Sequence, residues 1–196
     1  MGNEINKTVA AISQDGGASW TFRKLGLQRN EGESDLVDPD VLILDDGTFR
    51  LYTTISYMGQ YARTYYSDSA DGVHFVRKGV AFDPGAQALD PSAIKIGNTF
   101  HIFAGGVAGD PEANWHGTSQ DAATYRYDGS MIFRMNGYGQ MMANGLAVDG
   151  GYRYYGFGND RNGGISSFFT RDGSDWTPDS GYRLSVEADS RLETGQ

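Results

Sequence analysis

The chain has 196 residues, of which 39% are hydrophobic and 13% aromatic, and its formal net charge is −9. This length allows one domain with a substantial core. The acidic charge argues against a nucleic-acid partner, which needs a basic face, and no apolar run reaches the roughly 20 residues that span a bilayer. The absence of cysteine excludes disulfides, thiolate metal sites and cysteine nucleophiles.

The N-terminal stretch "MGNEINKTVA" lacks the apolar segment of about 7–15 residues that a signal peptide needs. In its natural context we expect a secreted or extracellular bacterial protein whose leader lies outside this sequence. An acidic surface rich in tyrosine and tryptophan suits a neutral ligand such as a sugar, although charge of this kind also serves solubility alone.

A phrase of the type Ser/Thr-x-Asp-(Gly)-x-x-aromatic occurs four times along the chain. It reads "SQDGGASW" from residue 13, "SDSADGVHF" from 67, "SQDAATY" from 119 and "TRDGSDW" from 170, with its aspartates 56, 50 and 51 residues apart. A second phrase interleaves with it, as "DPDVLILDDGTFRLYTT" from 38, "DPSAIKIGNTFHIFAGG" from 90 and "ANGLAVDGGYRYYGFG" from 143. A unit of about 50 residues is in the range of a β-propeller blade.

Each unit predicts four antiparallel strands. An apolar first strand, such as residues 41–44, is followed by a tight Asp-Gly or Gly-Asn turn and by a second strand that alternates in period two. The third strand, such as residues 62–67 or 165–170, precedes the Ser/Thr-x-Asp phrase, which makes the turn into the fourth. The aspartate can accept backbone N–H groups of that turn, and the aromatic residue can pack between blades. We therefore interpret these phrases as structural.

The predicted fold class is all-β: a β-propeller of four-stranded blades, with about 3.5 blades present. The predicted boundaries are a partial blade at residues 1–37, blades at 38–87, 88–142 and 143–178, and a C-terminal segment at 179–196. Because three and a half blades do not close a ring, three alternatives stay open. The chain is a fragment, residues 183–186 and their neighbours supply the missing strands, or further copies complete the ring as a homo-oligomer. Residues 107–118, rich in Gly, Pro and Asn, are expected to form a loop.

Two aspartates stand at the start of the first strand in successive blades, Asp38 in "DPD" and Asp90 in "DPS". Proline is tolerated at the first residue of a strand, so Asp-Pro can simply form the turn into each blade. In a propeller these strand starts surround the mouth of the central channel, on the face opposite the Ser/Thr-x-Asp turns. Two carboxyl groups across one pocket suit glycoside hydrolysis, in which one activates water or attacks and the other protonates the leaving oxygen.

The Asp-Pro strands and the phrases that follow them resemble the first two blades of five-bladed propeller glycoside hydrolases of the arabinanase and β-xylosidase type (family 43 and its relatives), over about residues 38–176. The Ser/Thr-x-Asp phrase is similar to the Asp box of sialidases. The resemblance implies that Asp38 is the general base and that Asp90 orients the acid and tunes its pKa. It also implies a third-blade glutamate as the acid, where this sequence has Asn144, which cannot donate a catalytic proton. A replacement acid could come from Glu112, from Asp160 or from blades outside the sequence.

The leading hypothesis is a glycoside hydrolase-like propeller that acts on or binds a neutral glycan at the channel mouth; whether it is an enzyme stays open. Asp40 and Asn144 would line the pocket, with Trp115 and His116 on its rim, although Trp115 could instead plug a blade junction. The second hypothesis is a non-catalytic glycan- or protein-binding module, or an incomplete propeller that assembles with other chains. No metal site and no cofactor are expected, and a Ca²⁺ ion in the channel stays an open alternative.

Overall fold

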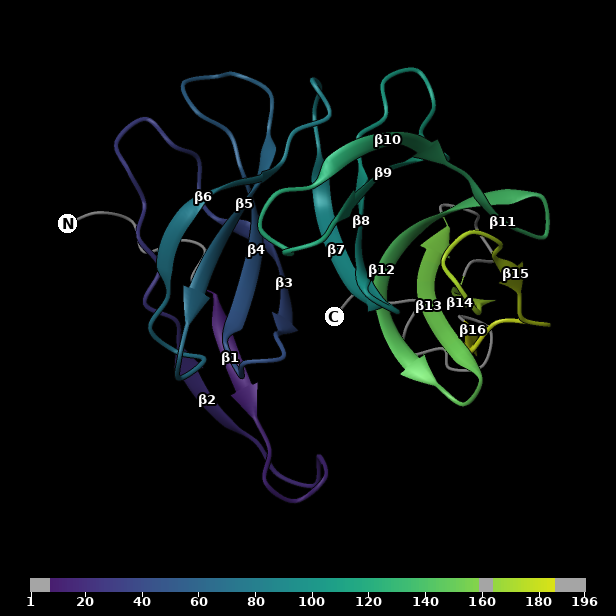
Figure 1. Ribbon diagram of the computed structural model, residues 1–196, viewed down its shortest axis with the longest axis horizontal. Coiled ribbons are helices and arrows are strands. Elements are labelled where there is room, and N and C mark those ends of the chain that lie inside the picture. The colour runs from purple at the N-terminus through teal and green to yellow at the C-terminus, as the bar shows by residue number, and fades with distance from the viewer. Residues whose placement is uncertain (1–7, 159–163, 186–196) are drawn as a thin grey trace.

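The computed structural model describes residues 8–158 and 164–185, and all of its regular elements there are strands (Figure 1). The predicted all-β class is therefore confirmed. No helix long and apolar enough to cross a membrane occurs in that part of the chain.

The strands form one hairpin and three larger antiparallel sheets in chain order. The hairpin pairs β1 (Val9–Ile12) with β2 (Thr21–Lys24). The first sheet has the order β3 (Val37–Ile43), β4 (Phe49–Ile55), β5 (Arg63–Ser69), β6 (Val76–Phe82). The second has β7 (Leu89–Ile96), β8 (Thr99–Gly105), β9 (Asn114–Ser119), β10 (Arg126–Met131). The third has β11 (Phe133–Met135), β12 (Tyr138–Val148), β13 (Gly151–Gly158), β14 (Gly164–Thr170), β15 (Thr177–Pro178), and β16 (Leu184–Ser185) also pairs with β14.

The three sheets repeat one meander, in which each strand pairs with the next along the chain. Strands β3, β7 and β12 begin the repeated units, and β7 contacts both β3 and β12. These first strands therefore meet on the inside of the arc that the sheets form in Figure 1. This arrangement is a partial β-propeller, as the 50-residue period predicts.

Aromatic side chains fill the space between successive sheets. Tyr125, the aromatic residue of its Ser-x-Asp phrase, packs edge-on against Tyr52 of the preceding sheet, and their hydroxyl oxygens lie 2.9 Å apart. Trp176 occupies the same place one sheet later, with its ring 6.0 Å from Phe103 and 5.8 Å from Tyr154. Each such ring is shared by two blades, so the hydrophobic core holds the blades together as well as each blade internally.

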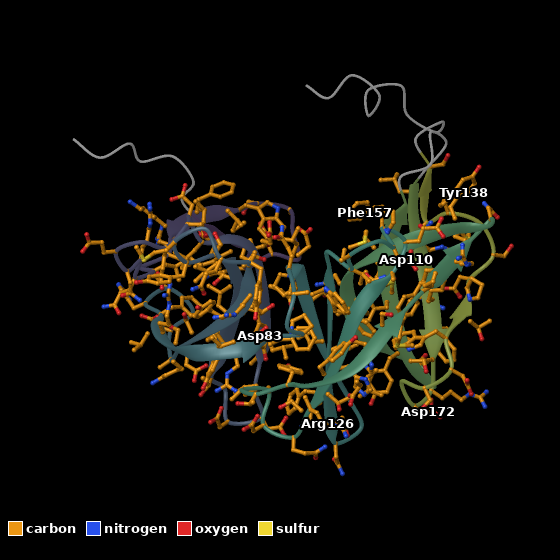
Figure 2. All side chains as sticks on the ribbon, turned by 90° about the horizontal axis from the view of Figure 1, so that it is seen from above. Asp83, Asp110, Arg126, Tyr138, Phe157 and Asp172 are labelled. Atoms are coloured by element: carbon orange, nitrogen blue, oxygen red, sulfur yellow. The ribbon has the colours of Figure 1, made fainter. Side chains whose placement is uncertain are left out.

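The Ser/Thr-x-Asp turns have the hydrogen bonds that their sequence predicts. Asp71 Oδ1 accepts the backbone N–H groups of Val73 at 2.9 Å and His74 at 2.8 Å, and it also accepts the hydroxyl of Ser69. The last two of these turns lie toward the same face of the molecule. In Figure 2, Asp172 of the last turn and Arg126, next to the third, point to one edge, whereas Tyr138 and Phe157 lie toward the other.

The start of the third sheet differs from the predicted strand pattern. Strand β12 begins at Tyr138, five residues before the predicted blade boundary at 143, and it forms a hairpin with the short strand β11. The turn between them is Asn136-Gly137, with positive φ angles of 53° and 88°, the backbone that a two-residue hairpin needs.

The expected loop at residues 107–118 is partly wrong, because β9 begins at Asn114. Asn114 is fully buried, donates its side-chain amide to the carbonyl of Gln140 and accepts the N–H of Met142. Its amide thus bonds to the backbone of the next blade, which places it inside the sheet although asparagine usually favours turns.

Candidate functional site

Strands β3 and β7 each begin with a β-bulge at the Asp-Pro pair. In β3, Val37 pairs with Thr54 and Asp40 with Tyr52, so that Asp38 and Pro39 together face one residue of β4. The same shift occurs in β7 at the Asp90-Pro91 pair. Proline has no N–H to give to the ladder, which explains why the extra residue is accommodated here.

The backbone of both aspartates is strained. Asp38 has a φ of 54° and Asp90 a φ of 50°, in the left-handed region that glycine occupies easily and other residues do not. Each such residue costs about 1–3 kcal/mol and persists only where its surroundings hold it. A bulge with this geometry turns a side chain away from the regular alternation of the strand, and such bulges are common beside active sites.

A cavity of about 170 Å³ lies where the first strands of the three sheets meet. Three of the predicted site residues, Asp38, Asp40 and Asp90, line it. The rest of its wall is apolar apart from backbone and consists of Pro39, Pro91, Met141, Met142, Ala143 and Phe157. Phe157 lies toward the face away from the Asp172 turn (Figure 2), so the cavity and this turn are separated as expected.

The carboxyl groups of Asp38 and Asp90 interact directly across the cavity. The pKa of Asp90 is raised, first by partial desolvation of its carboxyl group, then by the negative charge of Asp38 and a hydrogen bond with it. Asp90 as a whole residue remains exposed, so the pair is open to solvent and to a ligand. A negative charge this close favours the protonated form of Asp90.

Asp40 lies on the same wall but in a drier environment. Burial raises the pKa of its carboxyl group to about 7. The backbone N–H of Ala93 in β7 donates to Asp40 Oδ2 at 2.8 Å, which joins the first strands of two neighbouring blades. No ion pair among the described residues includes Asp40, so no cation compensates the cost of ionising it.

Among its described residues, the third sheet contributes no carboxyl group to this cavity. Strand β12 also has a register shift, between Met142 and Asn144, with Ala143 as the extra residue. Asn144 is exposed, pairs with Tyr155 across the ladder and does not line the cavity. The structure thus brings Met142 and Ala143, rather than Asn144, to the aspartate pair.

Trp115 and His116 lie in strand β9, away from the residues that line this cavity. Trp115 Nε1 donates to the carbonyl of Gln87 at 2.8 Å, and the ring packs edge-on against Tyr127. This contact matches the alternative in which Trp115 fills a blade junction.

His116 stacks between His101 and Phe103, with ring centroids 5.3 and 5.0 Å away. Burial, and then the neighbouring His101, lower the pKa of His116 to about 4, so its ring is neutral at ordinary pH. In this structure His116 therefore serves the packing of the sheet.

Glu112, one of the two replacement acids considered from the sequence, forms an ion pair with Arg134. Arg134 Nη1 lies 2.6 Å from Glu112 Oε2, and a backbone hydrogen bond from Gly139 together with this arginine lowers the pKa of the glutamate. Asp160 lies outside the described residues. The apolar wall residue Phe157 was not predicted, although the period-two alternation of "GYRYYGFG" marks its strand.

Metal binding has little geometric support in the described part of the chain. No group of three or more His, Asp or Glu side chains there is placed to hold a metal ion.

Several solved structures with sugar-processing names share this fold. Zg3597, a family 117 glycoside hydrolase from Zobellia galactanivorans, matches with a TM-score of 0.66 and 14% identity over 91% of this chain and 63% of its own. β-1,2-Mannobiose phosphorylase from Listeria innocua matches with a TM-score of 0.70 and 15% identity over 89% of this chain and 53% of its own. Sucrose-6-phosphate hydrolase from Lactobacillus gasseri matches with a TM-score of 0.59 and 19% identity over 76% of this chain and 35% of its own.

The chain spans less than two thirds of the length of each of these three proteins. No protein-family model and no curated protein matches the sequence. At these identities the likeness shows the fold alone: the chain has the propeller fold of glycoside hydrolase-like proteins.

Proposed function

We propose that this protein is a glycoside hydrolase that acts on a neutral glycan in the cavity between β3, β7 and β12. The observation that carries the proposal is the Asp38–Asp90 pair. Two successive blades each hold an aspartate in a strained left-handed backbone, and both carboxyl groups meet at one solvent-open cavity. A turn that only connected blades would not need strain of this kind twice.

In this proposal Asp38 is the general base that removes a proton from the attacking water. Asp90, whose raised pKa favours its protonated form, donates a hydrogen bond to the Asp38 carboxylate and holds it in position. The apolar wall formed by Met142 and Phe157 gives the hydrophobic face of a sugar ring a surface to contact. The net charge of −9 fits a neutral substrate better than an acidic one.

The test is turnover of a panel of 4-nitrophenyl glycosides of neutral sugars by the wild type and by Asp38→Asn. We expect Asp38→Asn to lower kcat/KM by about 10²–10⁴-fold, the usual contribution of a general base, with an unchanged circular dichroism spectrum. Asp149→Asn, an exposed turn residue between β12 and β13, is the matched control and keeps full activity. Full turnover by Asp38→Asn would disprove the assignment.

A second candidate function is that of a non-catalytic glycan-binding module. In this proposal, further copies of the chain are also binding partners. It is favoured by the third sheet, which offers Met142 and Ala143 where a catalytic carboxyl would complete the cavity. Binding on a glycan array without turnover of any glycoside would select this function. Under both proposals we place the protein outside the cell, where its glycans would be met; secretion of the natural gene product tests this.

A further inference from the structure

Hydrolysis at the Asp38–Asp90 cavity needs a group that protonates the leaving oxygen, and the described residues narrow the choice. The described residues of the third sheet line the cavity without any acid, and the backbone N–H of Gly139 and then the Arg134 guanidinium favour the ionised form of Glu112. Asp90 is engaged with Asp38. Among the residues that the structure describes, the remaining carboxyl group on the cavity wall belongs to Asp40.

Asp40 has the geometry of a fixed carboxylic acid. Its Oδ2 accepts the N–H of Ala93 at 2.8 Å, so a backbone donor from the neighbouring blade sets the orientation of the group. The backbone N–H of Val41 also donates to this carboxyl group, so donors from its own strand and from the neighbouring blade fix its orientation. In β3, Asp40 follows Asp38 after the bulge, so the same short segment supplies both groups to one cavity.

We propose that Asp40 is the general acid of this site and protonates the glycosidic oxygen while Asp38 deprotonates the attacking water. The inference rests on the proposed glycosidase function. The bond from the anomeric carbon to the leaving oxygen breaks, and that oxygen takes the Asp40 proton. Water forms the new bond to the anomeric carbon and gives its proton to Asp38. Exchange with solvent returns a proton to Asp40 and removes one from Asp38, so the balance closes without a further reactant.

The charges around Asp40 are compatible with this role. Asp38 and Asp90 share its cavity, and neither supplies a positive charge that would favour the ionised form of Asp40. The nearby tyrosines Tyr52, Tyr125 and Tyr154 are neutral, because burial raises the pKa of each above its usual range. Arg50 is bound by Asp68 at 2.7 Å. A carboxyl group that burial brings to a pKa of about 7 is half-protonated near neutral pH, as a general acid requires.

Dependence on the leaving group provides the test, with Asp40→Asn as the variant. Its amide oxygen can still accept the Ala93 N–H, so the contact between the blades is kept. The 2,4-dinitrophenolate group of a 2,4-dinitrophenyl glycoside leaves without protonation. The methoxy group of a methyl glycoside of the same sugar leaves only when an acid protonates its oxygen. We expect Asp40→Asn to lower kcat/KM by at least 100-fold for the methyl glycoside and by less than fivefold for the dinitrophenyl glycoside, and to remove the alkaline limb of the pH profile.

Ser92→Ala is the matched control. Ser92 stands in β7 where Asp40 stands in β3, two residues after the Asp-Pro aspartate, and its hydroxyl likewise joins two blades through Tyr154 at 2.7 Å. Loss of such a contact alone would affect both glycosides equally. Equal losses for both glycosides in Asp40→Asn would therefore overturn the assignment of Asp40 while leaving the glycosidase proposal intact.

A wild type that cleaves neither glycoside would instead contradict the proposed function. Carboxyl ¹³C titration of the wild type and Asp40→Asn gives a readout that needs no turnover. We expect one resonance that titrates near pH 7 in the wild type and is absent in the variant. If every aspartate resonance titrates below pH 5, Asp40 is not the acid.

Discussion

At the scale of single residues, the chemistry depends on what surrounds each carboxyl group. Asp38, Asp40 and Asp90 all line one cavity, yet Asp90 is exposed and paired whereas the carboxyl group of Asp40 is desolvated and bonded to the Ala93 N–H. The Asp-Pro sequences predict that Asp38 and Asp90 lie together. They do not predict the left-handed backbone, because Asp-Pro favours an extended residue before proline in most contexts. The apolar stretch that follows Asp40 gives no sign of its raised pKa.

The raised pKa of Asp40 predicts how stability depends on pH. Because the folded state holds the proton more tightly than the unfolded state, Asp40 makes its full contribution to stability below about pH 4. That contribution is lost as pH rises through about 7. The free energy of unfolding of the wild type minus that of Asp40→Asn should fall by about 1–3 kcal/mol between pH 4.5 and pH 8. Urea titrations of both proteins at the two pH values measure it; a constant difference would show that Asp40 titrates normally.

The backbone at Asp90 predicts a second effect on stability. Because a residue with a φ of 50° is strained unless it is glycine, Asp90→Gly should be more stable than Asp90→Ala by about 1 kcal/mol. The midpoint of urea unfolding compares the two variants, which lack the carboxyl group equally. At an exposed position with ordinary backbone the order is reversed, because glycine loses more entropy on folding; Asp149 provides that control.

At the scale of elements, the repeated turns explain why so much of the fold could be predicted. Asp-Gly and Ser/Thr-x-Asp phrases fix local backbone conformation, so their spacing predicted the strands of the first two sheets. The hairpin of β11 and β12 was missed although Asn136-Gly137 is a typical turn sequence, because it lies outside the repeat. The loop expected at residues 107–118 was too long and covered most of β9, because Asn114 obtains its hydrogen bonds from the next blade and not from a local turn.

The same turns predict that identical local bonds contribute unequally to stability. Asp121 accepts the N–H groups of Ala123 and Thr124, and its own carbonyl accepts a hydrogen bond from Arg50 of the preceding sheet at 2.7 Å. Asp121→Ala should lower the free energy of unfolding by about 1–3 kcal/mol, the net contribution of about two hydrogen bonds, because the turn that presents the Asp121 carbonyl to Arg50 loses its local support. Asp15→Ala removes similar bonds from the exposed β1–β2 turn and should change the global transition by less than about 0.5 kcal/mol. Equal losses in urea titrations would show that the contact between sheets is irrelevant.

At the scale of the whole molecule, the β1–β2 hairpin forms one side of the arc of blades, and no described strand precedes it in the chain (Figure 1). Tyr125 and Trp176 each pack on the sheet that precedes their own. Trp20, the equivalent residue of the hairpin, is 53% exposed, and Phe22 on β2 is 66% exposed. The period of the sequence predicted about 3.5 blades, but it carries no information on what covers this side, because neighbouring blades are specified by contacts rather than by local backbone.

These exposed rings predict concentration-dependent self-association. Elsewhere in the arc, equivalent aromatic side chains pack between blades. If a second molecule covers Trp20 and Phe22, burial of their apolar surface stabilises the complex by about 25 cal/mol per Å². Sedimentation velocity between 5 and 200 μM should show the weight-average mass rising for the wild type, and Trp20→Ser/Phe22→Thr should remain at the monomer mass. Tyr138→Ser, which removes an exposed ring on the opposite side of the arc, is the control and should associate as the wild type does. A wild type that stays monomeric at 200 μM would mean that the arc is stable as a single open molecule, and the homo-oligomer expected to complete the ring would have to be abandoned.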